Sequence, residues 1–270
     1  MKTILFLCAF CVSMFAVPNC YEINKIEKPN ATPKEAVFVL IDETTPFGDS
    51  LKEQIVNNAL KFAEFGNHIF VAKYSAFLDG RYNEVLFEFT LDTPLDEKAR
   101  YELNKNSLAK FDKCLKDQLG YVRKNMAQKI NDAFLKDGES VAKSDIFYAL
   151  QDFSKNSIAT FEAETKVVLL ASDMLENSSI ATFYAKGAPR QINAKKELEI
   201  LSKNELFGDF GEAKIYVVGA GLTETKKGSK SGYVTPQILN SLREFWNDYF
   251  SSSNANLVEM GTPALKRSVK

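Results

Sequence analysis

Two carboxylates in this sequence directly follow apolar segments. Asp42 follows one such run, with Thr44 two residues later, and Asp173 follows another; Ser144 lies between them, just before a helix-like pattern. Two carboxylates that meet without a counter-charge repel, and the pKa of one of them rises. A divalent cation removes this cost, and oxygen donors of these kinds suit Mg²⁺ or Mn²⁺ better than Zn²⁺. Asp42, Thr44, Ser144 and Asp173 are therefore candidate metal ligands, although Asp alone also ends many strands because it favours turns.

Alternating strand and helix patterns would position these residues. Continuous apolar runs such as "AVFVLI" and "VVLLA" are typical of strands buried on both faces of a parallel sheet. The runs "HIFVAKYSAF" and "EVLFEFTL" flank the turn-like "LDGRYN" and predict a hairpin. The expected fold is a three-layer, Rossmann-like α/β sheet, mainly parallel with one antiparallel edge strand. Sites in such sheets lie at the carboxyl ends of the strands, where the strand order reverses. Further strands are expected at 213–222 and 255–260, and helices at 49–65 (with Gly66 as C-cap), 95–134 (bent or divided at Gly120), 145–153, 195–202 and 236–250.

The polar segments, in this order, resemble the metal-ion-dependent adhesion site of the von Willebrand factor type A domain. The family motif Asp-x-Ser/Thr-x-Ser corresponds to "DETTP" at 42–46, its helix-start threonine to Ser144 in "SDIFYAL", and its "TDG"-like strand end to "SDM" at 172–174. The resemblance spans about 35–265 and implies a bacterial-type, exported domain with a modified site. Two residues depart from the motifs. Pro46 stands where a second hydroxyl is expected, with Thr45, Asp49 or Ser50 as substitutes, and Met174 replaces a glycine and would place a side chain beside the site.

The resemblance implies a binding module and not an enzyme. Asp42, Thr44, Ser144 and Asp173 would hold Mg²⁺ or Mn²⁺, and an acidic side chain of a partner protein would complete the coordination. One alternative is a metal-free interaction scaffold in an envelope complex. A less favoured alternative is a magnesium-dependent phosphoester hydrolase, for which Glu43, Asp49 and Glu176 are the acidic residues nearby in sequence.

Composition excludes several other functions. The 34 Lys and Arg residues balance 35 Asp and Glu, so no global charge attracts nucleic acid. With one histidine, His68, neither a catalytic Ser-His-Asp triad nor a multi-histidine metal site is expected. The sequence "GAGLTE" lacks the third glycine of a dinucleotide-binding loop, and "KKGSKSG" does not follow the order of a phosphate-binding loop.

The N-terminal residues predict export. Lys2 precedes an apolar run of roughly fourteen residues, which fits the core of a signal peptide better than a membrane span. Cleavage after Ala16, lipidation at Cys20 and an uncleaved anchor remain open, and so do periplasmic, membrane-anchored and secreted locations. Cys20 and Cys114 would remain in the mature chain, either paired or as thiols.

The expected domain organisation is one folded unit with short extensions. A signal segment is assigned to 1–20 and a polar linker to 21–34. The domain covers 35–265, with a helical insertion at about 95–140 whose charged residues suggest a solvated face, and a short tail follows at 266–270. The sequence does not determine the oligomeric state.

Overall fold

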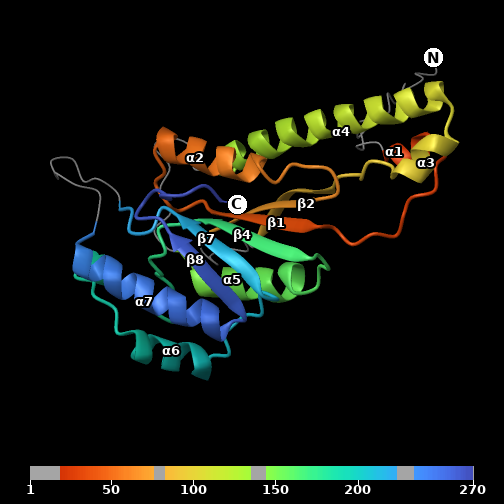
Figure 1. Ribbon diagram of the computed structural model, residues 1–270. Coiled ribbons are helices and arrows are strands. Elements are labelled where there is room, and N and C mark those ends of the chain that lie inside the picture. The colour runs from red at the N-terminus through yellow and green to blue at the C-terminus, as the bar shows by residue number, and fades with distance from the viewer. Residues whose placement is uncertain (1–18, 76–82, 135–143, 224–233, 270) are drawn as a thin grey trace, which may run out of the picture.

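The computed structural model describes residues 19–75, 83–134, 144–223 and 234–269. It shows a six-stranded sheet between two layers of helices (Figure 1). The strand order is β3-β2-β1-β4-β7-β8, and every neighbouring pair is parallel except β2–β3. The expected α/β class and the antiparallel edge strand are thereby confirmed. The strands are β1 (Glu35–Asp42), β2 (His68–Tyr74), β3 (Glu84–Thr90), β4 (Thr165–Ala171), β7 (Ala213–Val218) and β8 (Ala255–Met260).

The central strands β1 and β4 are apolar along their length because both faces of the sheet are covered. Alternate residues of β1 pack into two separate cores. Phe38 and Leu40 belong to the core on one face of the sheet, and Val39 and Ile41 belong to the core on the other face. Strand β4 divides its side chains in the same way. This two-sided burial explains why the sequence shows unbroken apolar runs and not alternation.

One face of the sheet is covered by an aromatic helix layer. Residues of α7 fill its centre, with Phe245, Trp246 and Tyr249 fully buried and in mutual ring contact. Thr235 caps α7 by accepting a hydrogen bond from Ile238 N, and Pro236 occupies the first turn as expected. The layer comprises α5 (Ile146–Phe153), a π-helical turn (Ser154–Ile158), α6 (Ala194–Lys203) and α7 (Pro236–Ser252), and the short pair β5 (Tyr184–Ala185) and β6 (Ala188–Pro189) lies in the β4–α6 connection.

The opposite face is covered by α2 (Asp49–Leu60) and α4 (Lys105–Asp132). Helix α2 ends five residues before the expected boundary, at Leu60, and Gly66 lies in a later turn with φ of 80°. Gly120 lies within the continuous α4 and does not divide it. The helical region is interrupted earlier, between α3 (Glu97–Glu102) and α4, where Asn104 caps α4 by accepting a hydrogen bond from Ser107 N.

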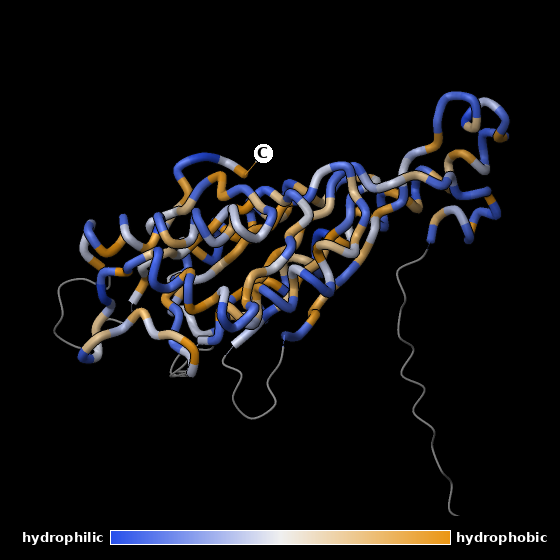
Figure 2. Tube along the Cα trace, turned by 90° about the horizontal axis from the view of Figure 1, so that it is seen from below, coloured by the Kyte–Doolittle hydropathy of each residue, from blue (hydrophilic) through white to orange (hydrophobic). Residues whose placement is uncertain are grey.

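Helix α4 is about 42 Å long, and its two halves pack into two different hydrophobic cores. Its C-terminal half packs Val122, Met126 and Ile130 against the sheet. Its N-terminal half extends beyond the sheet and binds α1 (Cys20–Ile23) through a small cluster that includes Phe111 and Leu115 (Figures 1 and 2). The expected insertion is therefore partly core and not simply a solvated helix.

Both ends of the described chain are more ordered than expected. Cys20 forms a disulfide with Cys114 of α4, and Tyr21 is buried beside it, so the start of the expected linker is part of the folded unit. This disulfide occupies the sulfur atom that lipidation of Cys20 would require. In the expected tail, Val269 is fully buried and its backbone N–H donates to Asn58 of α2. Residues 1–18 of the expected signal segment (1–20), most of the expected hairpin turn, the part of the expected insertion after Phe134 and the "KKGSKSG" sequence lie outside the described residues.

Candidate functional site

The candidate residues meet where the strand order reverses. Strand β1 pairs with β2 on one side and with β4 on the other, and the chain crosses between them. Asp42 is the last residue of β1, and Ser172 and Asp173 directly follow β4. Because the two strands are parallel neighbours, their carboxyl ends lie at the same edge of the sheet. Ser144 reaches this edge from the segment that precedes α5.

The carboxylate of Asp42 is the centre of the cluster. Its Oδ1 accepts hydrogen bonds from Thr44 N at 3.0 Å and Thr44 Oγ1 at 2.6 Å. Its Oδ2 accepts hydrogen bonds from Ser172 Oγ at 2.9 Å and Ser144 Oγ at 3.2 Å. Burial raises the pKa of Asp42, and these hydrogen bonds counteract the rise because they stabilise its charged form. Thr44 and Ser144 thus lie against Asp42 at the edge that the sequence predicted, whereas the contact from the third segment is made by Ser172 and not by Asp173.

Asp173 is the second carboxylate of this edge and is 8% exposed. Its Oδ1 accepts a hydrogen bond from Leu175 N at 2.8 Å, and its own N–H donates to Thr45 Oγ1 at 2.9 Å. Burial raises the pKa of Asp173 well above its usual range, and the charge of Asp42 raises it further. Within the described ranges, neither Asp42 nor Asp173 forms an ion pair with Lys or Arg. A cation at this edge would relieve the repulsion between the two carboxylates.

Two hydroxyl residues complete the cluster and were not among the candidate ligands. The hydroxyl of Ser172 donates a hydrogen bond to the Asp42 carboxylate, and the hydroxyl of Thr45 accepts a hydrogen bond from the backbone N–H of Asp173. The sequence signal for Ser172 is its position next to Asp173, and Thr45 is one of the three expected substitutes for Pro46. The other two substitutes, Asp49 and Ser50, are exposed in the first turn of α2.

Met174 does not place its side chain beside the site, contrary to the expectation. It adopts the left-handed conformation with φ of 62°, which the glycine in the family motif would adopt without strain. Its side chain is fully buried in the aromatic core, and its carbonyl accepts a hydrogen bond from Trp246 Nε1 at 2.9 Å. Met174 therefore forms a left-handed turn and directs its side chain into the core.

Glu176 connects the strand tip to the start of α5. It is fully buried, and its Oε2 accepts a hydrogen bond from Phe147 N at 3.2 Å, in the first turn of α5. The next residue, Asn177, donates its backbone N–H to Ser144 O at 3.0 Å. Burial raises the pKa of Glu176 well above its usual range. These contacts fix the position of Ser144 relative to the end of β4.

The cluster can supply a hard-oxygen coordination set. In the part of the chain that is described, no group of three or more His, Cys, Asp or Glu side chains is placed to hold a metal ion. The strand-tip cluster has another composition, with two carboxylates and the hydroxyls of Thr44, Ser144 and Ser172. A hydroxyl can donate its proton to a carboxylate and still offer a lone pair to a cation. This donor set fits Mg²⁺ or Mn²⁺ and offers nothing to a softer metal.

The acids considered for hydrolysis lie in other environments. Glu43 pairs with Lys73 at 2.9 Å, Asp49 is exposed at the start of α2, and Glu176 is bonded to α5. His68 is at the opposite end of its strand, where its ring stacks on Phe161 at 3.8 Å. Its Nδ1 shares a hydrogen bond of 2.8 Å with Thr90 Oγ1, which is a structural arrangement.

Comparison with known proteins assigns no family. No family model matches the chain, and no curated protein matches it. Among solved structures, the three N-terminal domains of the type V pili tip protein Mfa5 from Porphyromonas gingivalis are similar with a TM-score of 0.33 and 16% identity, over 54% of this chain and 20% of that chain. The pilus adhesin SpaC from Lactobacillus rhamnosus GG has a TM-score of 0.38 and 8% identity, over 87% of this chain and 29% of that protein. An aerotolerance-related membrane protein from Bacteroides fragilis has a TM-score of 0.30 and 10% identity, over 85% and 92% of the two chains.

The chain thus spans less than a third of the chains in the two pilus-protein structures, and at these TM-scores the similarities identify no family. Within the described ranges, no helix combines the length and the apolar character needed to cross a membrane.

Proposed function

We propose that this protein is an exported binding module of the von Willebrand A type, which recognises a partner protein through a divalent cation. The observation that carries the proposal is the convergence of Thr44, Ser144 and Ser172 on the carboxylate of Asp42, with Asp173 beside it. The site lies at the reversal of strand order, where open α/β sheets bind their ligands.

In this proposal, Asp42 and Asp173 supply the negative charge and the hydroxyls of Thr44 and Ser144 supply neutral oxygen donors. The bound ion would offer a coordination position to an acidic side chain of the partner protein. Thr44 is half-buried and Pro46 is exposed, so this side of the cluster faces the solvent from which a partner would approach. Glu176 acts as a positioning residue, because it holds the segment that carries Ser144.

The Cys20–Cys114 disulfide supports export, because disulfides persist mainly in oxidising compartments outside the cytosol. The apolar N-terminal run of the sequence agrees with this interpretation.

Titration calorimetry and thermal unfolding with Mg²⁺ or Mn²⁺ test the cation site. Binding at an ion concentration of about 100 times Kd should add about 2.7 kcal/mol of stability, which corresponds to a rise in Tm of at least about 5 °C. Asp173→Asn should abolish both the heat and the shift. Glu199→Gln, which removes one acidic charge on the exposed side of α6, should change neither. A folded wild-type sample that gives no heat and no shift with either ion would refute the proposal.

A metal-free scaffold is the second candidate. It is favoured by the four hydrogen bonds that already satisfy the Asp42 carboxylate, and by Pro46, which has no donor atom. Partner capture that persists in chelator and in Asp173→Ala would support the scaffold over the cation-dependent module. We propose that the protein binds a partner and does not catalyse a reaction. Turnover of a generic phosphoester that disappears in Asp42→Ala would overturn the proposal that the protein is not an enzyme.

A further inference from the structure

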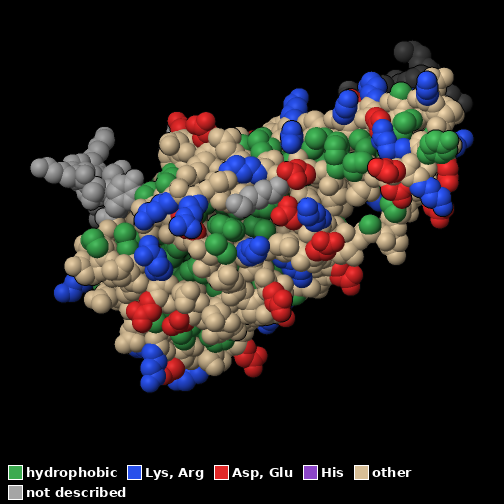
Figure 3. Space-filling view, in the orientation of Figure 1, with side chains coloured by type: hydrophobic (Ala, Val, Ile, Leu, Met, Phe, Trp, Pro, Cys, Tyr) green, Lys and Arg blue, Asp and Glu red, His purple; other side chains and the backbone are tan. Residues whose placement is uncertain are grey.

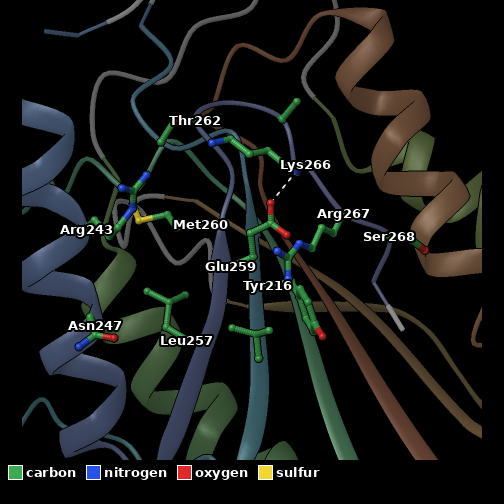
Figure 4. Close-up of a pocket in the computed structure, with 12 residues that line it drawn as sticks. Tyr216, Arg243, Asn247, Leu257, Glu259, Met260, Thr262, Lys266, Arg267 and Ser268 are labelled. Carbon is green, nitrogen blue, oxygen red and sulfur yellow. Dashed lines mark hydrogen bonds between the residues drawn. The ribbon is translucent and has the colours of Figure 1, made fainter. Parts of the chain in front are cut away.

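Strand β8 is a terminal strand of the sheet and borders a groove. It pairs with β7 on one side and has no neighbouring strand on the other among the described residues. Val258, in the middle of β8, is 45% exposed. A groove of about 610 Å³ runs along this strand (Figure 4). A terminal strand presents unpaired backbone N–H and C=O groups on its outer side, which are a template for another strand.

The groove is lined from both faces of the sheet. Arg243 and Asn247 reach it from α7 on one face, and Tyr216 of β7 belongs to the core on the other face. The segment that follows β8 contributes Lys266 and Arg267 (Figure 4). The groove therefore encloses the free edge of β8 and is not confined to one face.

The charge of this groove is positive. Arg243, Lys266 and Arg267 are exposed, and none of these cations forms an ion pair within the described chain. Glu259 is the single acidic residue of the lining, and its Oε1 already accepts a hydrogen bond from Lys266 N at 2.6 Å. In Figure 3, Lys and Arg side chains gather left of centre, over the region of β8 and the C-terminal segment.

We propose that the edge of β8 binds an extended acidic segment of a partner protein by strand addition. The segment extends the sheet through main-chain hydrogen bonds, and its alternate side chains point to the two faces of the sheet. Acidic side chains on one face meet Arg243, and those on the other meet Lys266 and Arg267. This surface is distinct from the strand-tip cluster, and its function does not require a cation.

Charge also argues against a second copy of this chain as the occupant. If two β8 edges paired, the cations of one copy would lie opposite those of the other, and like charges facing each other across strands are destabilising. These cations lie beside β8, on α7 and on the segment after the strand, so two paired edges would bring both basic linings together. The same cations attract an acidic strand. The positive charge of the groove therefore disfavours a second copy of this chain and favours an acidic segment of a partner protein.

Fluorescent peptides test the proposal. The probe is an extended acidic peptide of about six to eight residues, which matches the six residues of β8. The first control is the same peptide with alternate backbone nitrogens methylated, which keeps the charge but blocks strand pairing. The second is a basic peptide of equal length. All titrations are made in chelator and repeated with Asp173→Asn, so a failure of the cation site does not affect the result.

We expect the acidic peptide to bind and to slow hydrogen exchange of the β8 amides, while the methylated and basic peptides bind at least about tenfold more weakly. The double variant Arg243→Glu/Arg267→Glu should weaken binding by at least about tenfold. Lys195→Glu, a charge reversal on the exposed side of α6, should not. Equal binding of the methylated peptide, or of the double variant, would overturn the proposal. So would a concentration-dependent dimer whose exchange protection maps to β8 without peptide.

Discussion

Removal of the Cys20–Cys114 disulfide should destabilise the protein strongly, although α1 itself is a single turn. The two cysteines are 94 residues apart. The loop between them contains β1, β2, β3 and α2, so the crosslink restricts half of the sheet in the unfolded chain. In the chain-entropy account of disulfides, a loop of this length contributes about 4.7 kcal/mol at 25 °C. Total stabilities of about 5–15 kcal/mol are usual, so this is a large fraction.

The native contacts around Cys20 do not depend on the bond. Cys20 N donates to Asp92 Oδ2 at 2.8 Å, and Tyr21 Oη donates to Thr93 O at 2.8 Å. The Tyr21 ring also packs edge-on against Phe111, with ring centroids 5.0 Å apart. The double variant Cys20→Ser/Cys114→Ser should therefore fold, and its loss of stability should come mainly from a less restricted unfolded state.

Urea unfolding measures this effect. The double variant should lose about 4–5 kcal/mol, with a fall in Tm of about 10–20 °C and a larger m-value because the unfolded chain is less compact. Each single Ser variant should match the double variant, since each breaks the same bond. Alkylation before reduction should leave Cys20 and Cys114 unmodified in the wild type. A loss below about 1 kcal/mol, or free thiols in the folded protein, would refute the reasoning.

Three further substitutions test local arguments by urea unfolding. Burial lowers the pKa of His68 to about 4, so the unfolded state binds an extra proton below its ordinary pKa of about 6.5. Stability should fall by at most about 3 kcal/mol between pH 6.5 and pH 4, and His68→Phe should remove this component. Gly219→Ala should cost about 2 kcal/mol or more, because φ is 109° and an added Cβ would lie 2.7 Å from an aromatic carbon. Glu176→Gln should change stability at pH 6 by less than about 1 kcal/mol, because an amide resembles a neutral carboxyl, whereas Glu176→Ala should cost about 3 kcal/mol.

Each of these predictions has a contrasting measurement. Gly120→Ala, inside α4 with open space around it, should stabilise by about 0.5–1 kcal/mol, in contrast to Gly219→Ala. An unchanged pH dependence in His68→Phe would show that the imidazole does not titrate as described. A loss in Glu176→Gln as large as that in Glu176→Ala would show that the carboxyl is charged at that pH.

The sequence predicted the sheet well because two-sided burial leaves a local signal. The runs of β1 and β4 are continuous and apolar, and the polar residues that follow them could be located at one edge from the parallel order alone. The hydrogen bonds of Thr44 and Ser144 to Asp42 agree with the expectation that these residues meet at one edge. Ligation of a metal ion by these residues stays a prediction.

The boundaries of α2 and α4 were less predictable, because tertiary packing decides them. Gly120 has low helix propensity but lies in a helix held on both sides by buried residues such as Leu115 and Val122. The break at Leu103 instead coincides with the cap at Asn104, a local signal that the apolar spacing concealed.

By itself, the sequence determined the α/β class, the antiparallel edge and the position of Asp42 and Asp173 at the ends of two central strands. Only the tertiary structure decided which hydroxyls touch Asp42, that Met174 turns into the core, that Cys20 bonds Cys114 and that a basic groove borders β8. The physical reason is the separation along the chain between the residues that create each feature. Burial periodicity is encoded in neighbouring residues, whereas a disulfide across 94 positions or a groove between α7 and the C-terminal segment exists only after distant parts of the chain have packed together.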